Sequence, residues 1–548
     1  MSTLLIATIF LPLMGAILMW VLAPLGRGIV RASALMITFI TLLAAGVLIA
    51  NFPSDPTAHA DYATTTLYSL EGVTQLDIRF CVALDGLGLW LFGLSALLVF
   101  SSVLVSWNVI RERAELFYAM LLLLEFGCLG VFVAQDIILF YVFFEFTLIP
   151  LFFLIGIWGS EERRYAAMKF FLFTLTGSLL TFLGLLAIVL MDYHQTGEQV
   201  MRFSIPELTR SLAENPIDGT YQWVIFWALF IGFAVKVPLF PLHTWLPLAH
   251  VQAPTAGSVI LAGVLLKIGT YGFVRFSLPM LPEATVAAMP VVLWLSVIGI
   301  LYGALVALAQ SDIKRLIAYS SVSHLGFCML GLFALNRVGL QGGTLQMVNH
   351  GLSTGALFAL VGMIYERYHT REIRHLGGLA RRLPWLAFFM LLFTLSSIGL
   401  PGLNGFVGEF MVLLAAFQAA WTESAGFLQY HLKWVAVLAV FGVVLGAWYM
   451  LWLYQRIFFG PVREPGHVTP ASDSPHEEVK DLNWREIGAL APLAFFVVWI
   501  GLQPAFFLDR MAPTLDPVTD VVQHALEARP GMAVGPEATS TETLARVR

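Results

Sequence analysis

Six ionisable side chains lie within long apolar stretches of the sequence, where a charge is costly. They are Glu145, Lys236, Lys267, His324, His350 and Glu409. A charged side chain at the centre of a membrane helix costs about 2.5 to 3.5 kcal/mol, and such residues usually mark a pathway for ions or protons. Carboxylates, amines and imidazoles all bind and release protons, and the imidazole does so near neutral pH. The spread of these residues over six apolar stretches predicts a line of proton-carrying groups.

Glu145 and Lys236 suggest how such a line could be controlled. Removal from water favours the neutral form of a lysine, and a nearby carboxylate favours the charged form. Two charges about 4 Å apart interact by about 4 kcal/mol at an effective dielectric constant near 20. Separating Glu145 from Lys236 could therefore release a proton onto Lys267, and the histidines could relay it onward.

Each of these residues also has a purely structural interpretation. A buried Glu and Lys can form a static pair that fixes helix packing, and His324 and His350 can be core histidines held by hydrogen bonds. The two histidines could also ligate a haem, which an optical spectrum without a Soret band would exclude. Four further residues could belong either to the pathway or to local structure: Glu125, Asp136, His243 and His250.

The composition places the chain in a lipid bilayer. Of its 548 residues, 59% are hydrophobic and 12% charged, and the mean hydropathy is +0.82, which is more apolar surface than a soluble domain can bury. Cys81, Cys128 and Cys328 lie far apart without a CxxC pair, which argues against an iron-sulfur cluster, a zinc site or a disulfide framework. We also find no phosphate-binding glycine motif. The sequence therefore predicts no cofactor, no metal and no nucleic-acid partner.

Fourteen apolar stretches are long enough to cross the bilayer as helices. They lie near residues 3–23, 31–50, 86–107, 116–134, 137–158, 167–191, 223–240, 254–277, 286–309, 314–335, 345–365, 385–418, 433–457 and 487–508. The first lacks a basic leader and a cleavage site, so we expect it to be retained. Residues 51–82 and 192–221 are predicted as long polar loops, and the tail from about Met511 as poorly ordered. The chain is thus expected to be an all-α polytopic membrane protein.

The distribution of basic residues predicts the orientation. Of the 30 Lys and Arg residues, 18 lie in loops after odd-numbered spans and six lie in or beside loops after even-numbered spans. Cytoplasmic loops are enriched in Lys and Arg, so both termini are predicted on the non-cytoplasmic side.

Two spans are interrupted by proline and glycine. The seventh breaks at Lys236-Val237-Pro238, and the twelfth at Gly399-Leu400-Pro401-Gly402. Broken helices at membrane depth usually line a hydrated cavity. Because the two spans cross in opposite directions, they suit an inverted repeat of spans four to eight and nine to thirteen, although two unrelated proline kinks would look the same. Counting 1.5 Å per residue from the start of span twelve, we expect Glu409 to approach the outer surface.

The longest motif carries a family resemblance. Residues 236–272 read KVPLFPLHTWLPLAHVQAPTAGSVILAGVLLKIGTYG. This stretch resembles the signature of the antiporter-like subunits of respiratory complex I and of multisubunit cation/proton antiporters. Residues 310–327 (QSDIKRLIAYSSVSHLGF) and 399–410 (GLPGLNGFVGEF) are similar to two more blocks of that family, so the resemblance extends from Leu84 to Phe459.

The resemblance implies fourteen transmembrane helices with two inverted five-helix repeats. The expected divisions are 1–110 for helices 1–3 with an external loop, 111–280 for the first repeat, 281–460 for the second, and 461–548 for the last helix and the tail. It implies that Glu145 and Lys236 form the regulatory pair, that Lys267 is the central carrier, that His324 and His350 are links, and that Glu409 is the terminal carrier. Within this family, Glu at position 409 favours the chain 4 branch, because the chain 2, chain 5 and antiporter relatives usually carry Lys there. The expected absence of a long lateral helix after the last span argues against the chain 5 type.

The implied function is proton translocation in a NADH:quinone oxidoreductase, coupled to quinone reduction elsewhere and without redox chemistry in this chain. The implied partners are other membrane-arm subunits, including two neighbouring antiporter-like subunits, in the inner membrane of a bacterium. Three alternatives stay open: a subunit of a multisubunit cation/proton antiporter, a subunit of a ferredoxin- or hydrogenase-linked relative, and a scaffold whose charges are inert.

Overall fold

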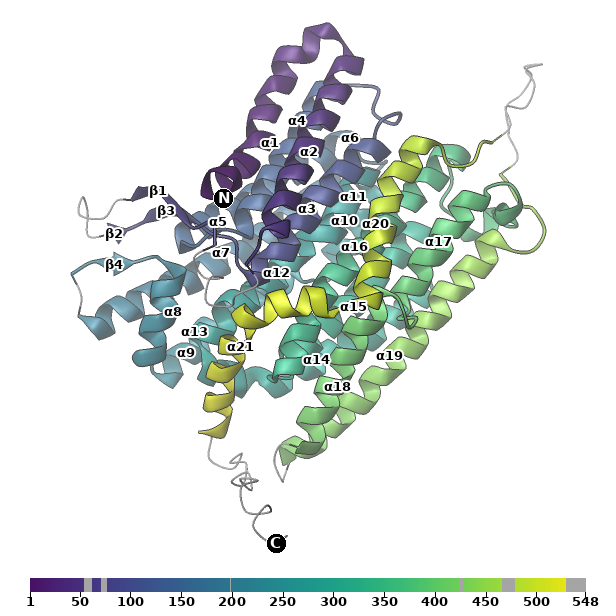
Figure 1. The fold of residues 1–548 in the computed structure, drawn as a ribbon. Coiled ribbons are helices and arrows are strands. Elements are labelled where there is room, and N and C mark those ends of the chain that lie inside the picture. The colour runs from purple at the N-terminus through teal and green to yellow at the C-terminus, as the bar shows by residue number, and fades with distance from the viewer. Residues whose placement is uncertain (54–61, 70–75, 198, 423–426, 466–478, 529–548) are drawn as a thin grey trace, which may run out of the picture.

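The computed structural model describes residues 1–53, 62–69, 76–197, 199–422, 427–465 and 479–528 as a bundle of tilted helices (Figure 1). The first half of the bundle consists of α1 (Ser2–Leu22), α2 (Arg27–Ala50), α3 (Gly86–Val105), α4 (Ala114–Val131), α5 (Ile137–Phe146), α6 (Leu148–Trp158), α7 (Arg163–Thr196), α8 (Ile205–Glu214), α9 (Gly219–Lys236), α10 (Trp245–Gln252), α11 (Thr255–Ile260), α12 (Leu266–Gly272) and α13 (Leu278–Met280). The second half consists of α14 (Pro282–Leu308), α15 (Ile313–Leu332), α16 (Arg337–Tyr368), α17 (Pro384–Ser397), α18 (Asn404–Thr422), α19 (Phe427–Phe458), α20 (Trp484–Leu502) and α21 (Ala505–Glu527).

Eleven helical segments among the described residues are long and apolar enough to cross a membrane. The all-α, multi-span fold class predicted from the sequence is therefore confirmed. The stretches predicted as spans seven, ten and twelve are helical too, as α9–α10, α15 and α17–α18, but they are not among the eleven. Two of them are broken, and α15 carries several polar side chains, including Ser320, Ser321, Ser323 and His324. The count of fourteen spans stays a prediction.

Both predicted interruptions are present. Helix α9 ends at Lys236 and α10 begins only at Trp245, while α17 ends at Ser397 and α18 begins at Asn404. In the second break, Gly399 and Gly402 adopt φ angles of +73° and +93°. This left-handed conformation strains residues with a side chain, so glycine is needed at both turns.

Two further irregularities were not expected from the sequence. The apolar stretch 137–158 is divided at Thr147 into α5 and α6. Pro150 lies at the third position of α6, where its ring removes the hydrogen bond to residue 146 and crowds that carbonyl. The stretch 255–280 contains two π-helical turns, η3 (Leu261–Leu265) and η4 (Phe273–Ser277), on either side of the turn that carries Lys267.

The two long polar loops contain secondary structure that the sequence reading did not predict. In the first, β1 (Thr65–Ser69) pairs antiparallel with β3 (Arg79–Val82). A second pairing joins β2 (Leu76–Asp77) in parallel to β4 (Met201–Arg202) of the other loop. Figure 1 shows these strands on one side of the bundle, near the N-terminus and α8.

The tail was predicted to be poorly ordered from about Met511, and this is wrong as far as Glu527. Helix α21 runs from Ala505 to Glu527 and packs against α3, α14 and α16. Apolar residues recur about every four positions along it, as Phe507, Met511, Leu515, Val522 and Leu526, and all are buried. The Pro, Ala, Thr and Glu content had hidden this stripe. Residues 529–548 lie outside the described part of the chain.

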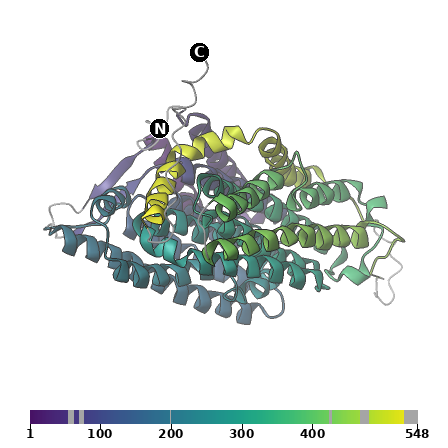
Figure 2. The ribbon, with the colours of Figure 1, turned by 90° about the horizontal axis from the view of Figure 1, so that it is seen from below.

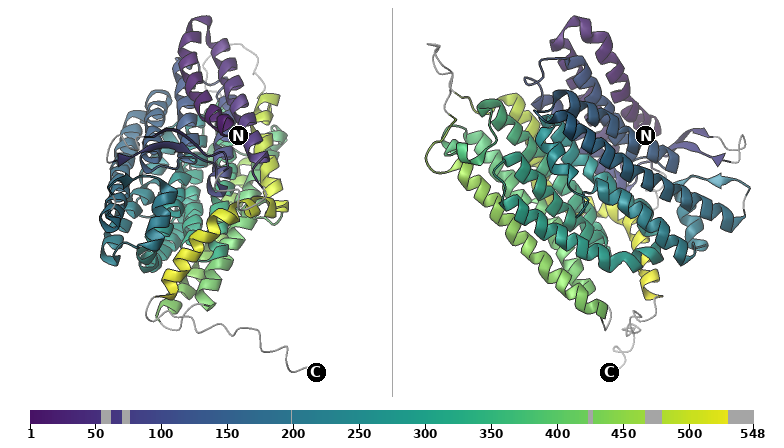
Figure 3. Two further views of the ribbon diagram at one scale, coloured as in Figure 1. Left: turned by 60° about the vertical axis from the view of Figure 1, so that its left-hand side comes forward. Right: turned by 180° about the vertical axis from the view of Figure 1, so that it is seen from behind.

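The bundle is longer in one direction than in the other. Seen from below, it is elongated, and α21 lies along one edge of it (Figure 2). Turned to the side, α1 and α2 project beyond the other helices, and α21 runs over the surface (Figure 3). Helices α3, α11 and α16 pack together at the centre, where almost every residue is buried.

Candidate functional site

Lys267 and His350 form the centre of the candidate site. The Lys267 side chain is completely buried, and its Nζ lies 2.6 Å from His350 Nδ1. It also donates to the Ala262 carbonyl within the π-helical turn η3. Such turns often accompany functional sites because they displace the backbone locally. With Nδ1 accepting from the ammonium, Nε2 of His350 has no partner among the described residues.

A close approach of two backbones brings Lys267 to His350. Gly263 and Gly351 face one another across η3 and α16, and a Cβ on Gly351 would lie 2.7 Å from the Gly263 carbonyl oxygen. Real side chains do not tolerate that distance, so only glycine allows the two helices to pack this closely. Lys267 and His350 each lie within one turn of this crossing.

His324 and Glu409 form a second contact. His324 Nδ1 lies 3.2 Å from Glu409 Oε1, and His324 Nε2 lies 3.2 Å from Ser397 Oγ. The carboxylate also accepts from Gln346 Nε2 at 3.4 Å. The rings of His324 and His350 are 5.8 Å apart between centroids. Both nitrogens of His324 therefore contact other side chains, which argues against the haem-ligand alternative.

Glu409 is not near the outer surface, as the count of residues had suggested. Only 5% of its surface is exposed, and it lies beside His324 within the bundle. The count assumed a rise of 1.5 Å for every residue. The segment from Ile398 to Leu403 forms turns instead of helix. It does not advance by 1.5 Å per residue along a helix axis, so Glu409 lies deeper in the bundle than it would on a continuous helix.

Glu145 and Lys236 lie near one another but do not form a direct ion pair within the described residues. Glu145 is close enough to act electrostatically on Lys236, while the Lys236 ammonium lies 4.6 Å from the centre of the Phe144 ring. One carboxylate oxygen of Glu145 is buried without a hydrogen-bond partner among the described residues. Among the residues that the structure describes, no hydrogen bond or ion pair connects Lys236 to Lys267.

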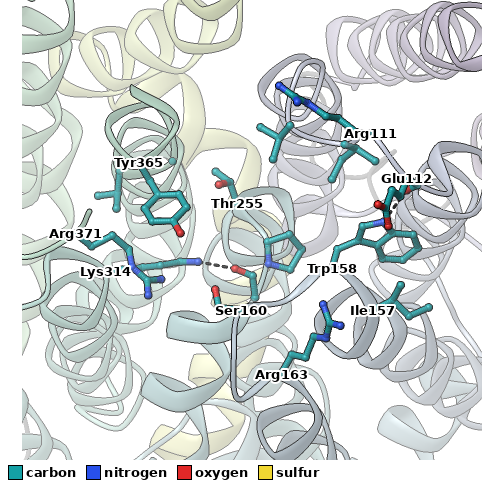
Figure 4. Close-up of a pocket in the computed structure, with 16 residues that line it drawn as sticks. Arg111, Glu112, Ile157, Trp158, Ser160, Arg163, Thr255, Lys314, Tyr365 and Arg371 are labelled. Carbon is teal, nitrogen blue, oxygen red and sulfur yellow. Dashed lines mark hydrogen bonds between the residues drawn. The ribbon is translucent and has the colours of Figure 1, made fainter. Parts of the chain in front are cut away.

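A polar cavity of about 360 Å³ lies between the ends of several helices (Figure 4). Its lining includes Arg111, Arg163, Lys314 and Arg371, and Figure 4 shows Arg111 and Arg163 on the side opposite Lys314 and Arg371. Only 6% of Lys314 is exposed, and its Nζ donates to the Ala253 carbonyl at 2.6 Å. A buried ammonium thus lies at the wall of a cavity that combines apolar residues with the charged side chains of Arg111, Glu112, Arg163 and Arg371.

His250 is a further buried histidine, on α10. It is fully buried, stacks on Phe358 at 4.4 Å, and has no hydrogen-bond partner on either ring nitrogen among the described residues. It is close enough to interact electrostatically with Lys314, Lys267 and His350. His250 is therefore within electrostatic range both of Lys314 at the cavity and of the central Lys267.

Comparisons with known proteins identify the family. A family model described as "NADH:quinone oxidoreductase/Mrp antiporter, TM" matches residues 134–431. The NADH-quinone oxidoreductase subunit M of Rhodobacter capsulatus is 41% identical over 524 residues, which cover 94% of this chain and 96% of the relative. Chain 4 of NADH-ubiquinone oxidoreductase from Arabidopsis thaliana is 40% identical over 517 residues, with 94% and 96% covered. A solved chain of respiratory complex I from Thermus thermophilus with bound NADH has a TM-score of 0.80 and 33% identity, and covers 94% of this chain and 99% of that chain.

The chain belongs to the subunit M (chain 4) family of NADH-quinone oxidoreductase. The resemblance inferred from residues 236–272, 310–327 and 399–410 is thereby confirmed. The chain is thus a multi-span membrane protein whose relatives are subunits of an enzyme complex.

In this subunit M family member, the structure brings together four of the six predicted site residues in two contacts, Lys267 with His350 and His324 with Glu409. Glu145 and Lys236 lie apart from these contacts. Of the four residues left open, Asp136 caps α5, while His243 stacks on Phe240 and meets Tyr302 edge to face. Glu125 is buried, and both of its carboxylate oxygens lack a partner among the described residues. The described residues contain no group of three or more His, Cys, Asp or Glu side chains that could hold a metal ion.

Lys314 was missed as a candidate, because it lies at the start of the span predicted at 314–335, next to Asp312, Ile313 and Arg315, where a basic residue is common. Asp312 does cap α15, by accepting from the Arg315 backbone N–H. Nothing in that tetrapeptide indicates that Lys314 turns inward and Arg315 outward. The only available signal was its position ten residues before His324 on the same helix.

Proposed function

We propose that the chain translocates protons as a membrane-arm subunit of a NADH:quinone oxidoreductase, driven by quinone reduction in other subunits. The observation that carries this proposal is the buried series Lys267, His350, His324 and Glu409, with contacts of 2.6 Å and 3.2 Å at its two ends. Buried ionisable groups are unfavourable unless they are paired or serve a function. Four of them in sequence, on α12, α16, α15 and α18, are difficult to explain by helix packing alone.

The proposed route begins at the cavity in Figure 4, on the face that the positive-inside rule assigns to the cytoplasm. A proton passes from the cavity to Lys314 and His250 and then to Lys267. His350 takes it from the Lys267 ammonium through Nδ1 and releases one from Nε2. Transfer to His324 proceeds through ring rotation or one bridging water, since the ring centroids are 5.8 Å apart. Glu409 is the last carrier before the outer side.

Glu145 and Lys236 are proposed to control this route. In the structure, the Lys236 ammonium lies over Phe144 rather than on the Glu145 carboxylate. If Glu145 moved next to Lys236, its carboxylate would keep the Lys236 amine protonated. Renewed separation would favour release of that proton toward Lys267. The break after Lys236 gives the backbone the freedom that such a movement requires.

The proposal places the chain in the inner membrane of a bacterium, with both termini on the non-cytoplasmic side. Its proposed partners are other membrane-arm subunits, including two neighbouring antiporter-like subunits. Residues 111–280 and 281–460 are proposed to be two inverted five-helix repeats, flanked by residues 1–110 and 461–548. The corresponding breaks after Lys236 and after Ser397 support this division. No redox step is assigned to this chain.

The test is proton pumping by the purified, reconstituted complex carrying Lys236→Ala. The quinone reduction rate and the assembly of the complex are measured alongside. Lys480→Ala is the matched control, because Lys480 is exposed. Loss of both pumping and quinone reduction in the assembled Lys236→Ala complex, with the control unaffected, supports a coupled proton pathway. Unchanged pumping in an intact Lys236→Ala complex overturns it and leaves the chain as a scaffold.

A further inference from the structure

An apolar groove of about 250 Å³ lies on the surface of the bundle, separate from the cavity in Figure 4. It is formed by α2, α3, α16, α20 and α21, and all sixteen residues that line it are apolar or glycine. Gly46 and Ala50 on its wall are exposed, so the groove opens on the surface of the membrane-spanning helices. Val348 and Leu352, on either side of His350 in α16, form its floor.

A cationic side chain lies at the mouth of this groove. The Arg510 guanidinium lies 3.9 Å from the centre of the Phe506 ring, and Phe506 lines the groove. One Arg510 nitrogen, Nη1, donates to the Phe506 carbonyl at 2.9 Å. The donors on Nη2 have no partner among the described residues, and Arg510 is partly exposed. The neighbouring Asp509 is exposed and carries the opposite charge.

The position of α21 suits the headgroup region of a bilayer. The helix follows α20 after only Gln503 and Pro504 and turns across the surface of the bundle (Figures 1 and 3). It buries one apolar stripe against α3, α14 and α16 and exposes charged residues on its outer side. Arg510 follows the end of the candidate membrane span at Leu502 by eight residues, so we expect it near the headgroups, with the groove reaching from it along the span.

We propose that a glycerophospholipid of the bilayer occupies this site, with its phosphate on Arg510 and one acyl chain in the groove. Guanidinium groups bind phosphate oxygens through paired N–H donors, and an acyl chain gains from every methylene that it buries. The bound chain would also cover the membrane side of α16 next to His350.

The experiment uses the purified, reconstituted complex in vesicles of phosphatidylcholine that contain a phosphatidylethanolamine with a photoactivatable acyl chain. After illumination, labelled peptides are identified by mass spectrometry. Labelling is expected on α2 and α20 at the groove, on peptides that contain Gly46 and Phe496. An absence of label there, with label on the remaining lipid-exposed surface, overturns the proposal.

Two variants make the test specific. A Cβ on Gly46 would meet no atom within 4 Å, so Gly46→Leu fills the groove without a clash. Gly28→Leu is the matched control, because Gly28 lies on the same helix, also has open space, and is outside the groove. Gly46→Leu is expected to reduce groove labelling at least fivefold, and Arg510→Gln is expected to reduce it about threefold, while Gly28→Leu and the exposed Arg374→Gln leave it unchanged. Equal labelling in Gly46→Leu and Gly28→Leu overturns the lipid site, as does cross-linking of the groove to a neighbouring subunit.

Discussion

The contact between His324 and Glu409 allows the effect of a single substitution to be calculated. Glu409→Gln keeps the size of the side chain and removes its charge. With 3.2 Å between Nδ1 and Oε1 and an effective dielectric constant near 20, the Glu409 carboxylate stabilises a charged His324 by about 5 kcal/mol. Without it, transfer of a proton from His350 to His324 becomes less favourable by about that amount.

The expected rate follows from this energy. If about half of the 5 kcal/mol appears in the barrier for proton transfer, the rate falls about 70-fold. The assay is proton uptake by proteoliposomes that contain the assembled complex, started with NADH and a quinone, together with the rate of NADH oxidation. We expect either that both rates fall or that fewer protons are moved for each NADH oxidised.

Two variants bracket this result. Glu409→Asp keeps the charge at a slightly greater distance and should retain a large part of the pumping. Glu161→Gln changes an exposed carboxylate in the same chain and should have no effect. If the assembled Glu409→Gln complex keeps both the parental pumping rate and the parental ratio of protons to NADH, then the charge of Glu409 is not part of the route, and the proposed exit is wrong.

Two other substitutions test different parts of the molecule. His350→Leu removes the hydrogen-bond partner of a buried ammonium, a bond worth about 1.5–3 kcal/mol, and pumping by the assembled complex should fall about 10- to 150-fold. His350→Gln can accept that hydrogen bond but cannot relay a proton, so it should not restore pumping; full activity of either variant would refute the relay. Burial raises the pKa of Asp136 from 3.8 to about 6. Its protonated form therefore adds about 3 kcal/mol to the free energy of unfolding below about pH 4, and this contribution is lost as the pH rises through 6. Asp136→Asn should therefore gain thermal stability relative to the parent between pH 4.5 and pH 7.5, measured by the melting temperature of the solubilised complex; a constant difference would refute this.

The sequence predicted those parts of the fold that depend on local chemistry. Long apolar stretches form helices wherever they occur, and the breaks at Pro238 and at Gly399 follow from backbone geometry that only nearby residues control. The break at Thr147 follows the same rule, but Pro150 lies within an apolar run and did not stand out. The π-helical turns around Lys267 depend on packing against α16, and no local residue pattern indicates them.

The candidate site could be predicted by residue type but not by arrangement. Lysine, histidine and glutamate are conspicuous in apolar stretches, and all six candidates were found in this way. Burial depends instead on which helix covers a residue. Lys314 is buried because the α10–α11 connection places the Ala253 carbonyl 2.6 Å from its ammonium, and these residues are 61 positions apart.

The break between α17 and α18 explains why the residue count placed Glu409 too near the outer surface. It also has a structural effect on His324. Ser397 and Glu409 are twelve residues apart, so a continuous helix would place them about 18 Å apart along its axis. In the structure, they hold the two nitrogens of one imidazole, each at 3.2 Å. Only a chain that turns back between them can do this, which the segment from Ile398 to Leu403 does. The interruption therefore positions a neutral hydroxyl and a carboxylate on opposite sides of His324, and a change in either half of the broken helix alters the environment of that ring.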